Sequence, residues 1–396
     1  MKAARFFAVV IAVSVLAWAV PGSAATAKMG KVKNQSFINA SLKTRALDGV
    51  KKGTEFLVSV QKPDGSFGDN PGFSGLAAYA LLLDPQYDPK GKSGKAAQKA
   101  LDYIATLVKP DGGIYEKGFG NYVTAVCLLA LTESGQKKYE KIIAGAKDYL
   151  LGTQCDESEN ISPDNMYYGG FGYGEGQGDG RPDLSNTQLA LIAIKAAEDY
   201  QKRFSSLAPD SATMEREEKE MGLHWKKALA FIDRCQNYKE INKQPYAVDD
   251  GGFIYETGQY KMERTHSYGS MTYAGALSLL YANVGPKDPR VQKAVSWIKN
   301  NYTVDFNPGF GTDSIYYYYA TFARALNAIG GDTLTDALGQ THNWREDLLN
   351  KLMTLQNADG SWQNPSNRYM ENSKELATAY SLIAAKFALN PKNGEL

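Results

Sequence analysis

The chain has 396 residues, of which 43% are hydrophobic and 22% are charged, a composition typical of globular proteins rather than of disordered or fibrous chains. Lys and Arg number 44 and Asp and Glu number 43, so the net charge of +1 gives no basic field for binding nucleic acid. Three Cys and three His are too few for a disulfide framework or a His-rich metal site.

The first residues have the three regions of a secretory signal peptide in the right order. Two basic residues precede an apolar stretch over residues 6–20, which is shorter than a membrane-spanning helix. Small residues follow, and cleavage is expected near Ala24 to Ala27. We therefore expect a signal peptide over residues 1–27 and a mature protein in the periplasm or outside the cell, without stable membrane insertion. A buried N-terminal helix is the alternative.

One kind of turn recurs six times along the rest of the chain. Each turn has a Gly followed closely by an aromatic or apolar residue, and these six residues are Phe67, Ile114, Phe171, Phe253, Phe310 and Trp362. An amphipathic run precedes each turn, as expected for a solvent-facing helix. An Ala-rich apolar run follows each turn, as expected for a helix that is buried on every side. These apolar runs cover residues 76–83, 123–131, 189–197, 271–281, 319–329 and 376–387.

Six helix pairs of this kind cannot each form a core, but stacked pairs can. The last pair still ends in a buried type of helix, whereas an open solenoid needs polar caps at its ends. We therefore predict an all-α fold, an α/α toroid of six inner and six outer helices, in preference to an open superhelix. The toroid is expected over residues 46–391, after a linker over 28–45 and before a tail over 392–396. Segments 155–186 and 198–224 are interpreted as insertions.

The first and last turns carry a motif that supports this fold. Gln61 and Gln356 each begin the pattern Gln, three residues, Gly, one residue, aromatic residue. This pattern resembles the repeat of the squalene and oxidosqualene cyclases and of the protein prenyltransferase β subunits. The resemblance covers residues 48–389 and implies the toroid. In such a repeat the Gln can bond exposed carbonyls, a left-handed Gly stops the outer helix, and the aromatic residue packs over it.

Four further segments resemble a bacterial group of exported prenyltransferase-repeat proteins that has no assigned reaction. They are residues 183–188, 234–237, 268–275 and 316–319. We interpret the chain as belonging with that group, which leaves its chemistry open.

The acid and metal motifs of these families do not recur in the chain. The nearest match to the Asp-rich acid of the cyclases, Asp249-Asp250, lacks the first Asp and falls in a turn, so we interpret both residues as turn and capping residues. The zinc site of the prenyltransferases needs Asp-x-Cys, but Ala125 stands two residues before Cys127. We therefore expect no zinc and no cofactor, and we interpret Cys127 as a small buried hydrophobic residue.

Two other cysteines occupy equivalent positions in neighbouring repeats. Cys155 and Cys235 flank the Gln at the ends of consecutive outer helices, so we expect them to lie near each other. An oxidising compartment permits a disulfide, and whether one forms depends on a Cα separation within about 7 Å.

The N-termini of the inner helices should share one end of the barrel, because each inner helix follows a Gly turn. Helix dipoles make this mouth electropositive, so we expect a ligand with an apolar or ring-like body and an anionic or strongly polar head. A barrel packed solid by its own tyrosines, and ordinary surface charge, are the alternatives. The ligand-binding candidates are Tyr168, Tyr255, Tyr316, Tyr369, Lys261, Arg264, His266, Arg368 and Trp362.

Four functions remain open at this stage, and the oligomeric state is open as well. The first is binding of an isoprenoid- or lipid-like ligand in an aromatic-lined cavity. The second is a divergent terpene cyclase or prenyltransferase-type enzyme. The third is a carbohydrate-active hydrolase or lyase, for which Glu256, Asp313 and Glu371 are weak catalytic candidates, because hydrolysis needs two carboxylates across a groove. The fourth is a structural interaction module.

Overall fold

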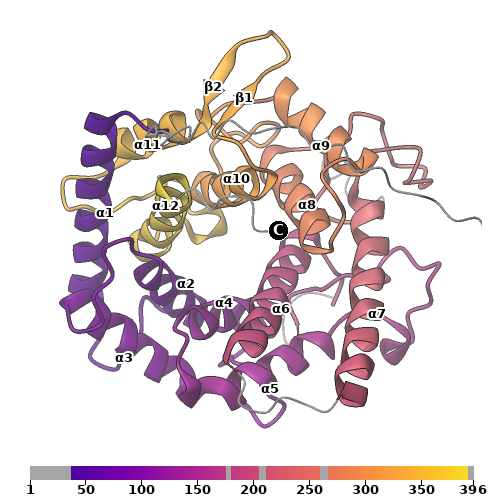
Figure 1. Ribbon diagram of the computed structural model, residues 1–396, viewed down its shortest axis with the longest axis horizontal. Helices are drawn as coiled ribbons and strands as arrows, with labels where there is room; N and C mark the ends of the chain where they lie inside the picture. The colour runs from indigo at the N-terminus through magenta and orange to yellow at the C-terminus, as the bar shows by residue number, and fades with distance from the viewer. Residues whose placement is uncertain (1–36, 175–179, 205–210, 259–265, 391–396) are drawn as a thin grey trace, which may run out of the picture. The chain divides into compact units, whose positions relative to one another are not determined.

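The helices of the chain alternate between an outer and an inner ring (Figure 1). The structure is a computed structural model that describes residues 37–174, 180–204, 211–258 and 266–390. The outer helices are α1 (Ala40–Val60), α3 (Lys92–Thr106), α5 (Glu140–Leu151), α7 (Ser211–Cys235), α9 (Pro289–Asn300) and α11 (Trp344–Leu355). The inner helices are α2 (Pro71–Leu82), α4 (Gly120–Glu133), α6 (Leu184–Phe204), α8 (Gly269–Tyr281), α10 (Ile315–Ile329) and α12 (Lys374–Leu389).

Short elements join the helices of the two rings. They are the 3-10 helices η1 (Lys137–Tyr139), η2 (Glu157–Glu159) and η4 (Arg368–Met370), and the antiparallel strands β1 (Thr333–Thr335) and β2 (Thr341–Asn343). None of the helices in the described ranges has both the length and the apolar character needed to cross a bilayer.

The inner ring is closed. Each inner helix contacts the next one along the chain, and α12 contacts α2, so that the last repeat meets the first. The outer helix α1 packs against both α11 and α12 across this junction. The predicted α/α toroid with six inner helices is therefore confirmed, and the open superhelix is excluded.

The burial of side chains matches the apolar patterns that distinguish the inner helices from the outer helices in the sequence. In α2 the consecutive residues 72–81 are all buried, as suits a helix with neighbours on every side. In α3 burial is confined to one face, with Gly94, Ala97 and Leu101 among the buried residues at spacings of three and four. The domain begins earlier than the predicted residue 46, because the Asn39 side chain accepts a hydrogen bond from the Ser41 amide at 2.9 Å and caps α1.

The six turn glycines allow close approach between neighbouring repeats. All six have positive φ, between 76° and 94°. At five of them an added Cβ would lie within 2.6 Å of a carbonyl oxygen of the neighbouring outer helix. The expected role as a helix stop is wrong, because α1 already ends at Val60 and Gln61 is extended, several residues before Gly65. The glycines instead let each turn lie directly against the backbone of the next repeat.

The Gln of the repeat motif bridges two repeats. Gln61 Nε2 donates to the Gly65 carbonyl at 3.0 Å and to the Ala96 carbonyl in α3 at 2.8 Å. Gln356 makes the corresponding bonds in the last repeat, and its second bond, to the Gly49 carbonyl of α1, crosses the junction that closes the ring. The bonds to exposed carbonyls are confirmed, with the addition that one acceptor belongs to the neighbouring outer helix. The same pair of bonds forms at Gln154 and Gln236.

The acidic pair nearest to the cyclase motif holds a turn. Asp250 Oδ1 accepts from the Gly252 amide at 2.9 Å, and Asp249 Oδ1 accepts from the Lys239 amide at 3.1 Å. The interpretation of Asp249 and Asp250 as turn and capping residues is therefore confirmed.

The segments expected to be insertions differ in structure. The described residues 155–174 and 180–183 belong to the connection from α5 to α6, whereas residues 198–204 continue α6 and residues 211–224 form the first part of α7. All three cysteines are buried and free, so Cys155 and Cys235 form no disulfide, and burial raises the pKa of the Cys127 thiol. The predicted signal peptide lies outside the described residues.

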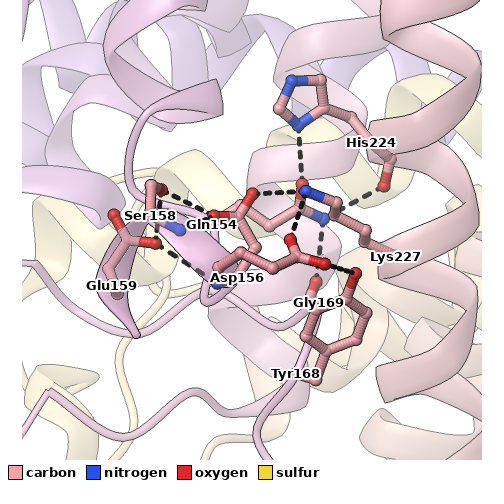
Figure 2. A network of polar contacts seen from close by, with 9 residues as sticks. Gln154, Asp156, Ser158, Glu159, Tyr168, Gly169, His224 and Lys227 are labelled. Atoms are coloured by element: carbon pink, nitrogen blue, oxygen red, sulfur yellow. Dashed lines mark hydrogen bonds and ion pairs between the residues drawn. The ribbon is translucent and has the colours of Figure 1, made fainter. Parts of the chain in front are cut away.

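A buried ion pair ties the α5–α6 connection to α7 (Figure 2). Lys227 Nζ lies 2.8 Å from Asp156 Oδ2, and the Asp156 side chain is only 9% exposed. Burial alone would raise the pKa of Asp156, but hydrogen bonds from Lys227 and Ser158 outweigh it and lower the pKa to about 2. Next to this pair, His224 Nδ1 lies 2.7 Å from Gln154 Oε1, so the bridging Gln is itself held in place.

This ion pair predicts a specific loss of stability in acid. Because the folded-state pKa of Asp156 lies below its ordinary value of 3.8, its stabilisation is present above pH 4 and is lost as the pH falls through 2. We expect Lys227→Met to lower the free energy of unfolding by about 2 kcal/mol at neutral pH, and by much less at pH 2. Urea unfolding at both pH values measures this. Lys374→Met is the control, because Lys374 and Asp359 form an exposed pair whose loss should cost less than about 1 kcal/mol.

Candidate functional site

A cavity of about 270 Å³ lies where the inner helices begin. All six inner helices contribute to its wall, and in five of them the third residue of the helix lines it. These third residues are Phe73, Tyr122, Met271, Tyr317 and Leu376. The cavity therefore occupies the expected mouth of the barrel, and the exposed side chains of Tyr369 and Met370 line it where it reaches the surface.

The wall of the cavity is predominantly aromatic. Ten of its eighteen described residues carry aromatic rings, and they are Phe73, Phe119, Tyr122, Tyr173, Tyr255, Tyr268, Phe310, Tyr317, Tyr369 and Tyr380. Several rings touch one another. Tyr268 stacks on Phe310 with ring centroids 4.8 Å apart, and Phe119 meets Tyr173 in a T-shaped contact at 5.4 Å. Such contacts fix the orientation of the rings.

Phe310 reaches the cavity because its repeat is irregular. In the fifth turn Gly309 packs against Ser267 and Tyr268 rather than against the next outer helix. The corresponding residues of the other five turns, such as Phe253 and Trp362, are fully buried in the core. The departure from the repeat thus turns one core position into part of the cavity wall.

Glu371 is the carboxylate of the wall. Its Oε1 accepts a hydrogen bond from the Tyr317 amide at 2.8 Å, and its Oε2 accepts one from Asn364 Nδ2 at 3.0 Å. The first bond caps the N-terminus of α10, where the helix dipole favours a negative charge. Glu371 is 1% exposed, and burial raises the pKa of its carboxyl, partly offset by these donors.

A second buried carboxylate, Asp183, accepts a hydrogen bond from Ser185 of the wall. Asp183 caps α6, accepting from the Asn186 amide at 2.9 Å and from Ser185 Oγ at 2.8 Å. Burial raises the pKa of Asp183, and its charge in turn adds to the burial that raises the pKa values of Tyr173 and Tyr255. These tyrosine hydroxyls therefore stay neutral at physiological pH. They lie 3.3 Å apart and form one hydrogen bond.

The mouth also concentrates backbone strain. Six described residues other than Gly have positive φ, and four of them line the cavity. These four are Phe119, Ser314, Tyr369 and Met370. A left-handed conformation costs an L-residue about 1–2 kcal/mol, and such residues cluster at binding and catalytic sites. The strain independently indicates that this end of the barrel is the functional one.

Only some of the candidates from the sequence meet in this cavity. Tyr255, Tyr369 and Glu371 line it. Arg368 and Asp313 pair with each other at 3.2 Å beside the rim, and Glu256 is buried outside the wall.

Three other ligand-binding candidates do not line the cavity, contrary to what the sequence predicted. Tyr168 donates to Glu157 in the network of Figure 2. Tyr316 is buried and donates to the Gln363 carbonyl at 3.3 Å, while Trp362 is a core residue whose Nε1 donates to the Leu352 carbonyl. The reason is that a buried Tyr or Trp satisfies its polar atom on the backbone and then serves as core.

The basic candidates of the mouth do not line the described part of the cavity. Lys261 and Arg264 lie outside the described residues, and His266 is exposed and is not part of the wall. Among the described lining residues there is no Lys, Arg or His. Glu371 and Asp183 offset the positive ends of α10 and α6. The described wall is therefore largely apolar, and its acidic side chain is Glu371.

Sequence reasoning missed most of the ring-bearing wall. Phe73, Tyr122 and Tyr380 were not singled out, although each lies on an inner helix, the first two at its third residue. Three of the wall residues share one feature that a sequence can show, because each is an aromatic residue at the third position of an inner helix. Recognising this feature requires the helix start to be known to within one residue.

Comparison with known proteins supports the fold and leaves the family open. No protein-family model and no curated protein matches the chain. A variant of the type II terpene cyclase MstE from Scytonema, solved with its product merosterolic acid A, is similar to 89% of this chain over 99% of its own length, with a TM-score of 0.51 and 12% identity.

A second solved structure has the same architecture and a different chemistry. An inactive variant of an α-1,6-mannanase of Salegentibacter, in complex with α-1,6-mannotriose, is similar to 87% of this chain over 99% of its own length, with a TM-score of 0.54 and 10% identity. Because one neighbour is a terpene cyclase and the other a glycosidase, the similarity shows a shared fold and selects neither reaction. The chain has the α/α-toroid fold of both enzymes.

Proposed function

We propose that the protein binds a small apolar ligand, of isoprenoid or lipid type, in the aromatic cavity at the mouth of the barrel. The observation that carries this proposal is the wall itself, in which ten of eighteen described residues are aromatic and three more are Met or Leu. A wall of this kind removes apolar surface from water at about 25 cal/mol per Å² and offers few polar partners. Export from the cytoplasm, expected from the first 27 residues, is part of the same proposal.

The carbohydrate alternative has less support. Hydrolysis of a glycosidic bond needs two carboxylates on opposite sides of the bond. Among the described lining residues Glu371 is the only carboxylate, and both of its oxygens accept hydrogen bonds from the protein. Asp313 faces Arg368 at the rim, and Glu256 is not part of the wall.

Titration with farnesol, an isoprenoid alcohol, and with α-1,6-mannotriose tests the proposal. We expect saturable quenching of the intrinsic fluorescence by farnesol and none by mannotriose. Mass spectrometry of the recovered farnesol separates binding from conversion, since unchanged farnesol indicates a binding protein and a cyclised product indicates an enzyme. Binding or cleavage of mannotriose without binding of farnesol would contradict the proposal.

Tyr369→Gly distinguishes a residue that binds ligand from one that supports the fold. Tyr369 is 47% exposed and has a φ of 59°, a conformation that Gly adopts without strain. We expect farnesol affinity to fall about tenfold, while the free energy of unfolding changes by less than about 1 kcal/mol. Asn283→Gly is the matched control, because Asn283 has the same φ of 59° but does not line the cavity, so farnesol affinity should not change.

A further inference from the structure

We propose that the end of the ligand enclosed by the cavity carries a permanent positive charge on a trialkylammonium group. This inference rests on the proposed function, because it names the chemistry of the ligand that the same cavity would bind. Three features of the wall support it: the faces of its rings, a cation already held at the rim, and the sign of its buried charges.

Aromatic faces attract cations, because the ring quadrupole is negative above and below the plane. Two pairs of neighbouring rings in this cavity stand at steep angles. Phe119 and Tyr173 make an interplanar angle of 77°, and Tyr317 and Tyr380 make one of 71°. In a T-shaped pair one ring presents its edge to the face of the other ring. The two faces of the edge-on ring are therefore not covered by the other ring of the pair. Rings arranged in this way form the walls of a box rather than a stack.

The rim shows that two of these rings already hold a cation. The Arg368 guanidinium lies 5.5 Å from the centroid of Phe310 and 5.3 Å from that of Tyr369. Both rings line the cavity. The Arg368 side chain is 60% exposed and pairs with Asp313, so it occupies the outer side of the rim. The same aromatic wall is thus in contact with a planar, weakly hydrated cation on that side.

The ionisable side chains at the described wall have the sign that a cationic ligand needs. Glu371 lies in the wall, and Asp183 accepts a hydrogen bond from Ser185 of the wall, while the described wall has no basic side chain. A primary ammonium is strongly hydrated and would need several hydrogen-bond acceptors on entering. A trialkylammonium group has no N–H to satisfy and presents a methyl surface to the rings. It therefore matches a wall that is aromatic and whose ionisable side chain is the acid Glu371.

Two alcohols that differ only at the far end of the chain test the inference. One ends in a trimethylammonium group and the other in the uncharged tert-butyl group, which has the same shape. We expect calorimetric titration to show the cation binding at least about tenfold more tightly than its isostere. Glu371→Gln should remove most of this difference, measured as the ratio of the two affinities in the same variant. Glu375→Gln, in the first turn of α12 and outside the wall, is the matched control and should preserve it.

Each outcome bears on a different statement. Equal affinity for the two alcohols overturns the inference and leaves the proposed function standing, whereas the absence of binding by both overturns both proposals. Equal effects of Glu371→Gln and Glu375→Gln would overturn the role of Glu371. A short-chain phosphatidylcholine, used as a third probe, distinguishes the source of the cation. Tighter binding than the free cation indicates a lipid headgroup, weaker binding indicates a free organic cation, and both results support a cationic ligand.

Discussion

Replacing Gly169 by alanine is expected to lower the free energy of unfolding by roughly 3–5 kcal/mol. Gly169 has a φ of 89°, and an added Cβ would lie 1.8 Å from the carbonyl oxygen of Lys227 in α7. Both atoms in this clash belong to the backbone or are fixed to it, so no side chain can move aside. The α5–α6 connection would have to move away from α7, which also weakens the Asp156–Lys227 pair and the Gln154 bridge shown in Figure 2.

Gly339→Ala separates the steric clash with the neighbouring backbone from the conformational cost of placing Ala at a positive φ. Gly339 has a similar φ of 83°, but nothing lies within 4 Å of its added Cβ. It should therefore show only the conformational cost of about 1–2 kcal/mol. Denaturant unfolding of both variants measures the difference. Equal losses for Gly169→Ala and Gly339→Ala would show that the close approach between repeats contributes nothing.

Between pH 7 and pH 10, the free energy of unfolding of the wild type is expected to rise by about 2–3 kcal/mol relative to that of Lys386→Met. Lys386 is 2% exposed and donates to the Ala80 carbonyl, and its Nζ lies 3.9 Å from Asp84 Oδ2. Burial lowers the pKa of Lys386 from 10.5 to about 8, although Asp84 and Glu133 act in the opposite direction. The buried cation therefore destabilises the folded protein relative to the unfolded chain, where the same amine is solvated.

The sign of the pH effect follows from the two pKa values. The penalty is fully present below pH 8, where the folded protein must carry the charge, and it disappears as the pH rises toward 10.5. Wild type should therefore gain stability over Lys386→Met as the pH rises, whatever their difference at pH 7. Lys52→Met is the control, because Lys52 lies in an exposed pair with Asp48 and should show no such trend. A flat difference for Lys386→Met would contradict the prediction.

The ring architecture could be predicted from the sequence because it depends on features that repeat. Six turns with Gly at the same place, each between an amphipathic and an apolar run, specify both the number of helix pairs and the kind of helix in each position. The left-handed conformation of the glycines and the bonds of Gln61 and Gln356 to exposed carbonyls were predicted and are found. The role of Gly in ending the helix was predicted and is not found, because the position of the last helical residue depends on local backbone geometry that a motif does not encode.

The site was harder to predict because it depends on the direction in which each residue of an inner helix points. The run Tyr316 to Tyr319 shows why. Tyr318 and Tyr319 donate to backbone carbonyls at 2.7 and 2.8 Å and belong to the core, while Tyr317 lines the cavity. Successive residues of a helix point about 100° apart, so an error of one residue in the helix start exchanges a cavity residue for a core residue. The connections that precede the inner helices differ in length, so the Gly turns do not fix that start.

The contact of α12 with α2 changes how this protein can unfold. In a linear repeat array the terminal unit has one interface, so the array can fray from either end. Here the first and last repeats bury each other, and no repeat can leave without breaking two interfaces. The loss of any one repeat also opens the cavity wall, since all six inner helices contribute to it. Folding and the integrity of the binding site are consequently a single cooperative unit, in which partial unfolding carries a higher free energy than it would in an open chain of the same repeats.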